Sequence, residues 1–413
     1  MLRLFHTADW HLGHCLHGVS RQLEHQQFLD WLLLELQNKQ ADALIVAGDI
    51  FDSANPSAAA QTQLYEFLVK ARTQLPALNI VLIGGNHDSA SRLDAPSSIL
   101  NALGVTVVGG LVREEDGAIN WDRLLVPLAN AAGDIEVWCG AMPFLRNADL
   151  PGDYDDEPLI SGVKALYAQL FNELQAKATQ DQALILTGHC YMVNGCVSEL
   201  SERKILGGNQ HALPVELFPE NIAYVALGHL HLAQTVGDNE HIRYSGSPIP
   251  LSFDESHYLH QVLQVDIKKG QPVEILALKI PRNIDLLRIP NSKDFAGLSA
   301  VLQQLEQMTF DENLPLEQRP FVELRIKLEK PEPGLRQQVE EVISKLPVRL
   351  LKISTAYSGS SKSLADVKME ERLEELQPLE VFQRCYQNKF DQDAPESMNT
   401  LFNELLENLR AKQ

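Results

Sequence analysis

Short apolar runs that end at a polar residue recur along residues 1–265 of the chain. Five runs predict buried β-strands, at Leu2–Thr7, Ala43–Ala47, Asn79–Ile83, Ala183–Thr187 and Ile222–Leu227. Segments with apolar residues at three- and four-residue steps lie between them and predict amphipathic helices. These helices are expected at Arg21–Gln40, Ser57–Leu75 and Leu159–Thr179. Alternation of strands and helices predicts an α/β layered sandwich.

The pattern changes between residues 272 and 290. Three shorter strands and two helices are expected after this point, at Ile275–Ile280, Phe321–Leu328, Val348–Ile353, Ser292–Gln307 and Pro333–Lys345. They indicate a small α+β module, although an extension of the first fold is an alternative. We therefore expect three regions: the main domain at 1–270, the α+β module at 271–357, and a linker with C-terminal helices at 358–413.

The C-terminal segment carries an amphipathic helical pattern. Its apolar positions follow helical spacing from Met398 to Leu409. With an earlier helical pattern that begins near Ser363, it would form a short hairpin of two helices. Such a hairpin packs either on its own domain or on a helix of a partner, and the spacing of the apolar residues favours neither. If it meets a partner, the residues expected to bind are Leu379, Phe382, Leu401, Phe402 and Leu405.

The polar residues that end the five strand-like runs are the main chemical signal. They are Asp9, His11, Asp49, Asn86, His87, Asp88, His189, His229 and His231. A single strand-end Asp or His is usually a cap or a surface group. In α/β sheets, however, ligands gather at the carboxyl ends of strands. Five runs that all end in Asp, Asn or His therefore predict one convergent site.

Carboxylate, amide and imidazole donors without a thiolate suit Mn²⁺, Fe²⁺ or Zn²⁺. We expect seven of these residues to bind two metal ions, with Asp49 as the candidate bridge. Two metals about 3.5–4 Å apart would hold a bridging hydroxide and promote in-line displacement at phosphorus. His87 is expected to act beside the metals, by stabilising charge or protonating the leaving oxygen, and Asp88 to orient its imidazole. Among the other histidines, only His14 and His17 lie near enough to Asp9 in the sequence to be tested for a role in the site.

Composition narrows the class of protein. With 413 residues, 45% apolar and 22% charged, the chain is typical of a soluble globular protein of two or three domains. No apolar stretch is long enough to predict a membrane span, and the first residues show no signal-peptide pattern. Five cysteines without a Cys-x-x-Cys pair favour a reducing, cytoplasmic location. The net charge of −20 predicts weak DNA binding by this chain alone, so a partner would supply basic surface.

The ordered motifs resemble those of calcineurin-like metallophosphoesterases. They are Asp9-x-His11, Gly48-Asp49, Gly85-Asn86-His87-Asp88, Gly188-His189 and Gly228-His229-x-His231. Longer segments are similar to the SbcD family, the nuclease subunits of bacterial SbcCD complexes. These segments are Phe5–Gly13, Val46–Asp52 and Arg243–Glu255, and the similarity is strong over residues 1–256.

This resemblance implies a Mn²⁺-dependent nuclease that cuts double-stranded DNA from ends and at hairpins, in DNA repair and recombination. It implies that one metal takes Asp9, His11, Asp49 and His231, the other takes Asp49, Asn86, His189 and His229, and His87 is a non-ligand catalytic residue. The α+β module would be a capping domain that shapes DNA access. The C-terminal helices would dock on an SbcC-type ATPase, in a heterotetramer with a dimer of the nuclease subunit.

Two other functions compete with this expectation. A phosphodiesterase or phosphatase for small molecules would use the same metal core, but it needs neither a capping module nor an amphipathic tail. A binding scaffold on an inactive fold would normally have lost ligands, and here all seven are present together with His87. The nuclease is therefore the leading hypothesis.

Overall fold

The computed structural model describes residues 1–150, 158–193, 195–196, 212–292, 294–329, 332, 334–357, 386 and 398. Residues 1–356 form one compact unit, and a second unit begins at Tyr357. The described residues form two six-stranded sheets, one four-stranded sheet and a two-stranded hairpin of β2 (Cys15–Leu16) and β3 (Val19–Ser20). The five expected partner-binding residues, Leu379, Phe382, Leu401, Phe402 and Leu405, lie outside the described part of the chain.

The first six-stranded sheet contains the strands that begin the chain. Its order is β14 (Glu274–Lys279), β13 (Gln261–Ile267), β1 (Leu2–Thr7), β4 (Ala43–Ala47), β5 (Asn79–Ile83) and β6 (Val105–Val108). Strands β1, β4, β5 and β6 run parallel, whereas β13 and β14 pair antiparallel. The parallel strands are mainly apolar because both faces of the sheet are covered, and β4 is apolar along its whole length.

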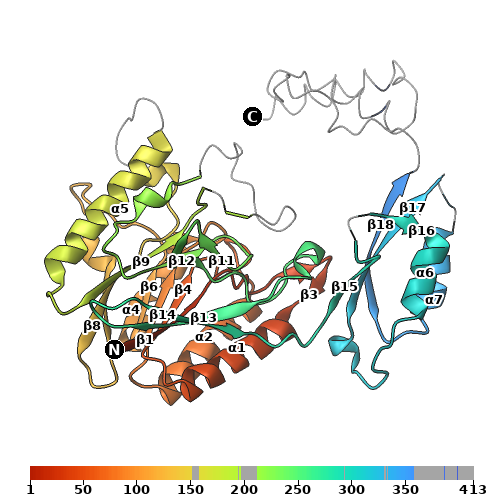
Figure 1. The fold of residues 1–413 in the computed structure, drawn as a ribbon, viewed down its shortest axis with the longest axis horizontal. Helices are drawn as coiled ribbons and strands as arrows, with labels where there is room; N and C mark the ends of the chain where they lie inside the picture. The colour runs from red at the N-terminus through yellow and green to blue at the C-terminus, as the bar shows by residue number, and fades with distance from the viewer. Residues whose placement is uncertain are drawn as a thin grey trace. The chain divides into compact units, whose positions relative to one another are not determined.

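The second six-stranded sheet faces the first. Its order is β11 (Gln234–Val236), β12 (Asn239–Tyr244), β10 (Tyr224–Gly228), β9 (Ala183–His189), β8 (Ile135–Gly140) and β7 (Leu125–Ala129). Inner side chains of both sheets, such as Ile45 and Val225, belong to a single buried core. The first sheet packs its outer face on α1 (Gln22–Asn38) and α2 (Ala58–Gln74), and α5 (Pro158–Lys177) covers the second (Figure 1). The layered α/β sandwich expected from the sequence is confirmed.

Local sequence explains where these elements begin and end. Helix α2 starts after Ser57, whose side-chain oxygen accepts a hydrogen bond from the backbone N–H of Ala60 at 3.2 Å. Such a cap satisfies one of the free N–H groups of the first turn. Two short helices, α3 (Ala90–Asp94) and α4 (Ser97–Ala102), then lead from the β5 loop toward β6. No helix within the described ranges is long and apolar enough to cross a membrane.

The four-stranded sheet has a core of its own. Strand β17 (Phe321–Leu328) pairs with β15 (Leu286–Ile289), β16 (Ala296–Gly297) and β18 (Arg349–Tyr357). Helices α6 (Leu298–Glu306) and α7 (Leu335–Ile343) pack on it through Val301, Leu305 and Val339. The strand expected at Ile275–Ile280 is not part of this sheet: as β14 it pairs with β13 in the first sheet. That placement differs from the expected boundary at residue 271.

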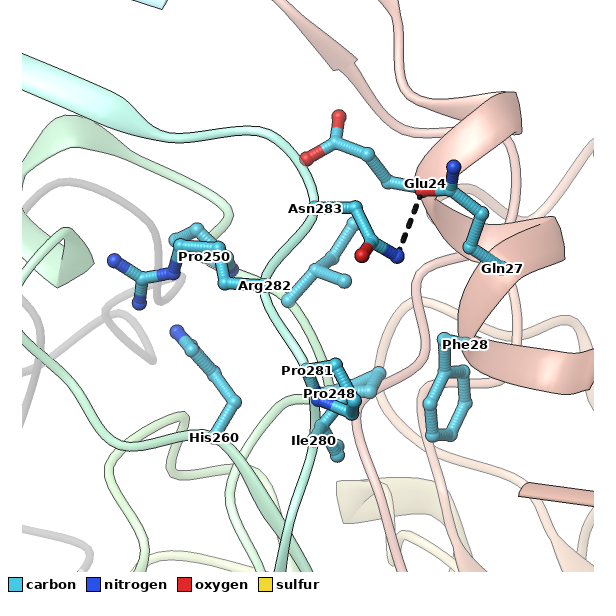
Figure 2. Close-up of a pocket in the computed structure, with 11 residues that line it drawn as sticks. Glu24, Gln27, Phe28, Pro248, Pro250, His260, Ile280, Pro281, Arg282 and Asn283 are labelled. Carbon is cyan, nitrogen blue, oxygen red and sulfur yellow. Dashed lines mark hydrogen bonds between the residues drawn. The ribbon is translucent and has the colours of Figure 1, made fainter. Parts of the chain in front are cut away.

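The chain passes from β14 to β15 along the outside of α1. There Pro281, Arg282 and Asn283 line a small hollow with Glu24 and Phe28, and the Asn283 amide donates a hydrogen bond to the side chain of Gln27 at 3.2 Å (Figure 2). Its volume of about 20 Å³ leaves room for about one water molecule. This hollow therefore marks a packed crossing of the chain rather than a ligand site.

Candidate metal centre

The loops that leave five strands of the two facing sheets meet at one place. Asp9 and His11 follow β1, Asp49 follows β4, and Asn86 follows β5. His189 ends β9, and His229 and His231 follow β10. The convergence expected from the strand ends is what the structure shows, because all five strands point their carboxyl ends to the same edge.

Backbone hydrogen bonds hold the loops together. The N–H of Asp9 donates to the carbonyl of Gly48 at 3.0 Å, and the N–H of His229 donates to the Asp9 carboxylate at 2.9 Å. The N–H of His87 donates to the Asp49 carboxylate at 2.8 Å. Glycine at position 228 permits this close approach, since a Cβ there would lie 1.9 Å from the carbonyl oxygen of Ala47.

The backbone of the site is strained. Among the described residues other than glycine, six have positive φ, and four of the six are Asp9, His11, Asp49 and His229. Aspartate and histidine adopt this conformation at a cost of about 1–3 kcal/mol, and such strain concentrates at functional sites. The strained residues coincide with the residues that the motifs single out.

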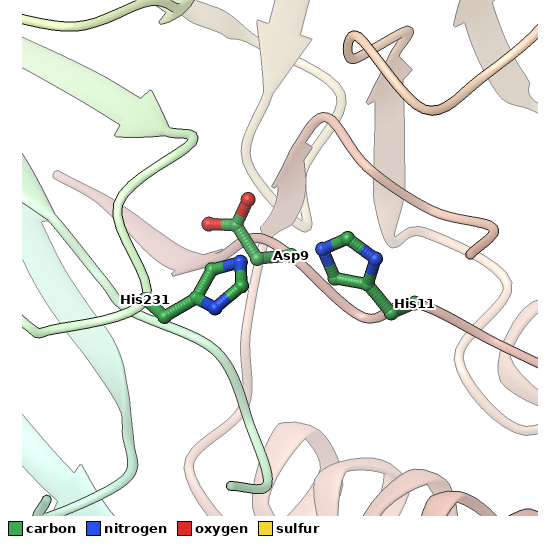
Figure 3. Close-up of side chains that lie close together, drawn as sticks. All are labelled: Asp9, His11 and His231. Carbon is green, nitrogen blue, oxygen red and sulfur yellow. The ribbon is translucent and has the colours of Figure 1, made fainter. Parts of the chain in front are cut away.

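Three groups of donor atoms form at this edge among the described residues: two consist of expected metal ligands, and the third joins His11 to Asp52 and His87. The ligand atoms of Asp9, His11 and His231 lie within 4.8 Å of one another, and Figure 3 shows these three side chains converging. Those of Asp49, His189 and His229 form a second group within the same limit. The side-chain oxygen of Asn86 lies 3.0 Å from the Nε2 of His189 and 3.0 Å from the Nδ1 of His229. Asp49 links the groups, since its Oδ2 is 3.3 Å from His189 and 3.6 Å from His11.

Hydrogen bonds fix which imidazole nitrogen faces the site. The Nδ1 of His189 bonds to the Ala47 carbonyl at 2.9 Å and the Nδ1 of His231 to the Glu255 carboxylate at 2.8 Å. A carbonyl or carboxylate oxygen only accepts, so these Nδ1 atoms carry a proton and the Nε2 atoms face the donor groups. Among the described residues, the Nε2 of the buried His11 has no hydrogen-bond partner, while its Nδ1 lies 3.4 Å from the Asp52 carboxylate. Buried nitrogens without partners are suited to metal coordination.

Electrostatics favour the metal-binding protonation states of His11, His229 and Asp49. Burial opposes the charged form of His189, but the Asp49 carboxylate outweighs it and raises the pKa of this imidazole to about 9, so a metal ion must displace a proton there. Burial lowers the pKa of His11 to about 4 and that of His229 to about 3, so both imidazoles are neutral near pH 7. Burial favours the neutral form of Asp49, but the imidazole of His189, followed by that of His11, lowers the pKa of this carboxyl below its usual range. Cys190 follows His189, and burial raises the pKa of its thiol to about 12. The site therefore offers oxygen and nitrogen donors and no thiolate, which fits two divalent metal ions.

His87 lies beside the two groups. Its ring packs edge-on against that of His11, with centroids 4.6 Å apart, and its Nδ1 donates to the backbone carbonyl of Asp52 at 2.7 Å. With Nδ1 engaged in this way, Nε2 is the nitrogen left to act on a substrate.

Asp88 has other partners than those expected. Its carboxylate accepts hydrogen bonds from the backbone N–H groups of Gly85, Ile50 and Phe51, at 2.9, 3.0 and 3.0 Å. The expectation that Asp88 orients His87 is therefore wrong. The two carboxylate oxygens tie the β5 loop to the β4 loop, and so hold Asn86 and Asp49 in place.

Three further residues join the site. Glu255 is fully buried and bonds to His231, and its second oxygen accepts from the N–H of Leu251 at 2.7 Å. Asp52 accepts from the Nδ1 of His14 at 3.0 Å and lies 3.4 Å from the Nδ1 of His11. Proximity in sequence correctly singled out His14, but His17 instead stacks on Phe253. Nothing near Glu255 in the sequence points to His231, which lies 24 positions away.

Comparisons with known proteins bear on this arrangement. The model of the family described as calcineurin-like phosphoesterase matches residues 2–233, which is more than half of the chain. The SbcD subunit of the SbcCD nuclease of Rhodobacter capsulatus is 40% identical over 84% of this chain and 86% of its own length. The SbcD subunit of Escherichia coli is 33% identical over 99% of this chain and 98% of its own. The chain belongs to the SbcD family of calcineurin-like phosphoesterases.

A second family model, described as Type 5 capsule protein repressor C-terminal domain, matches residues 282–390. It begins in the segment that leads to β15, so it covers the four-stranded sheet and continues to residue 390. The SbcD subunit of Bacillus subtilis is 35% identical over 65% of this chain and 67% of its own length. The chain belongs to the SbcD family, and its donor groups lie side by side at the sheet edge. The protein is therefore a metal-dependent phosphodiester hydrolase with a dimetal site.

Proposed function

We propose that this chain is a DNA nuclease that cuts double-stranded DNA from ends and at hairpins, using two Mn²⁺ ions. The observation that carries the proposal is the pairing of two donor groups through Asp49, in a chain of the SbcD family. When bound, two divalent ions supply positive charge and an activated water for in-line displacement at phosphorus. Mn²⁺ suits a donor set of carboxylate, amide and imidazole groups.

The metal ligands are assigned by proximity. Asp9, His11 and His231 would hold one ion, Asn86, His189 and His229 would hold the other, and Asp49 would serve both. The hydrogen bonds of His189 and His231 to Ala47 and Glu255 orient the rings, as second partners of metal-binding histidines do.

His87 is the proposed catalytic residue that binds no metal. The carbonyl of Asp52 anchors its Nδ1, which leaves Nε2 to donate a hydrogen bond or a proton to a phosphoryl or leaving oxygen. Asp88 and Asp52 act as positioning residues. Asp88 holds the two loops through backbone N–H groups, and Asp52 holds the ring of His87 through its backbone carbonyl.

We propose that the nuclease works with an SbcC-type ATPase. Support comes from the relatives, which are named as one of the two components of the SbcCD nuclease, and from the charge of −20, which disfavours DNA binding by this chain alone. Residues 1–280 would carry hydrolysis, the four-stranded sheet would cap the DNA path, and the amphipathic residues after 357 would dock on the ATPase in a heterotetramer. Removing residues 364–413 is expected to abolish complex formation and spare hydrolysis of a small phosphodiester.

The decisive experiment compares two substrates. Hairpin-ended duplex DNA and bis(p-nitrophenyl) phosphate are incubated with Mn²⁺ and either the wild type or the Asp49→Ala variant. DNA cleavage that is lost in the variant supports the nuclease. Turnover of the small ester alone, with DNA intact even after the ATPase is added, would replace it with a small-molecule phosphodiesterase. Metal binding without turnover of either substrate would favour a scaffold.

A further inference from the structure

A pocket opens beside the second donor group, at the carboxyl edge of the second sheet. Its volume is about 260 Å³. Its walls come from the loop after β8, the first turns of α5 and the loop after β9. The residues that define it are Phe144, Arg146, Leu159, Tyr167, His189 and Tyr191.

The pocket shares a wall with the metal centre. The side chain of His189 belongs to the donor group on one side and lines the pocket on the other. The ring of Phe144 packs edge-on against that imidazole, with centroids 6.2 Å apart. In a nucleotide only the sugar separates phosphate from base, so a phosphate at this donor group places a neighbouring base within reach of the pocket.

The walls are held in place by hydrogen bonds. The hydroxyl of Tyr167 donates to the carbonyl of Thr187 at 3.2 Å, and that of Tyr191 donates to the carbonyl of Gly195 at 3.3 Å. The carbonyl of Tyr191 accepts from the N–H of Leu213 at 2.8 Å. These bonds make the pocket a preformed cavity, as is usual for ligand sites.

Size and chemistry point to a flat aromatic ligand. Pockets for drug-sized molecules start at about 300 Å³, so this one suits a single heterocycle. Its described lining is mainly aromatic and aliphatic and contains no carboxylate, in a chain with 55 acidic and 35 basic residues. Arg146 adds a positive charge at the pocket, where its guanidinium lies over the ring of Phe144 at 5.6 Å and donates to the carbonyl of Asp88 at 3.0 Å.

We propose that this pocket binds an unpaired nucleobase of the strand that is cut at the metal centre. A base inside a duplex is stacked on both faces, so it must leave the stack to enter. The inference rests on the proposed nuclease function and deepens it: the strand is locally unpaired at the point of cleavage, as at a hairpin tip or a frayed end. Because stacking on aromatic rings tolerates every base, the pocket selects unpaired structure rather than sequence.

The test uses a hairpin with either a normal or an abasic nucleotide beside the cleaved phosphodiester, cut by the full chain with Mn²⁺. In the wild type, the abasic hairpin is expected to be cut about tenfold more slowly, the scale of one lost base–aromatic stack. In Tyr191→Ala the two hairpins should be cut at equal rates, and Tyr191→Phe should keep the wild-type preference. Leu159→Ala should weaken the preference, whereas Leu259→Ala, at a 68% exposed leucine outside the pocket, should not.

Two results would overturn the inference. One is an equal cleavage rate of the normal and the abasic hairpin in the wild type. The other is a cleavage rate of the abasic hairpin by Tyr191→Ala that is reduced by the product of the two separate reductions. If the wild type cuts no DNA even after the ATPase is added, the nuclease proposal fails, and binding of 2-aminopurine deoxynucleotide tests the pocket separately. Quenching of its fluorescence that is lost in Tyr191→Ala supports base binding. No quenching in the wild type would overturn the inference, and would indicate that another occupant, such as a protein segment, fills the pocket.

Discussion

The edge where the two six-stranded sheets meet differs sharply from the four-stranded sheet. At the metal centre, ionisable side chains such as Asp9, Asp49 and His189 are buried, and four residues other than glycine have positive φ. Within the described residues of 286–357, Glu323 is the only buried charged residue, and no residue other than glycine has positive φ. Glu323 is moreover paired, with Arg288 at 2.8 Å and with Ser354 at 2.8 Å.

The difference shows what function demands of a fold. The four-stranded sheet follows ordinary rules, with apolar residues inside and its buried charge satisfied. The metal centre breaks those rules, because ligands must face one another in a fixed geometry before the metal binds. The surrounding sheets supply the stability that this arrangement lacks. Mutations in the two regions should therefore affect different measurements.

Replacing His87 by alanine should have the largest effect, and only on turnover. Loss of an acid or charge-stabilising group is expected to lower kcat about 10²- to 10⁴-fold. Metal content, measured by mass spectrometry of the purified protein, and the melting temperature should stay close to wild type. Loss of a metal ion from this variant would contradict the assignment of His87 as a non-ligand.

Leu324→Ala should show the opposite behaviour. Leu324 is fully buried in β17, so its truncation should lower the free energy of unfolding by about 3 kcal/mol. The matched control is Leu316→Ala, at a leucine that is 60% exposed, which should change stability by less than about 0.5 kcal/mol. Urea denaturation gives both values. A large fall in metal affinity for Leu324→Ala would mean that the two regions are energetically coupled.

Metal removal should destabilise the strained region. A ligand at a hundred times its dissociation constant stabilises the folded state by about 2.7 kcal/mol. We therefore expect the melting temperature to fall by several degrees after chelation and to recover when Mn²⁺ is restored. Asp49→Ala should recover less, since it loses a shared ligand, whereas Leu316→Ala should recover fully. Equal recovery in Asp49→Ala and the wild type would argue against the bridging role.

The smallest effect is expected for Glu255→Gln. Glu255 orients His231 through a hydrogen bond of 2.8 Å, and loss of such a second partner typically lowers metal affinity about 10- to 100-fold. Isothermal titration with Mn²⁺ measures it, with Glu274→Gln as the control because Glu274 is exposed on β14. An unchanged affinity in Glu255→Gln would show that the buried carboxylate serves packing alone.

Local pattern predicted three strands of the first sheet at both ends, whereas β9 extends two residues past the expected Thr187 and β10 begins two residues after the expected Ile222. Strands β1, β4 and β5 match the expected residues at both ends, because short apolar runs bounded by polar turns allow little else. The sequence did not reveal that β14 joins the first sheet, since strand pairing depends on which edge is free and not on the strand's own residues. Helix boundaries were wrong by one or two residues for α1, α2 and α5, where end effects decide.

The sequence by itself determined the donor types, their order and their convergence at one sheet edge, because parallel strands carry their carboxyl ends to the same side. The tertiary structure decided the direction of each side chain. It turned Asp88 toward three backbone N–H groups and brought Glu255 to His231. It also placed an aromatic pocket against His189. These contacts join residues whose separation in space is set by the packing of two sheets, which no local pattern encodes.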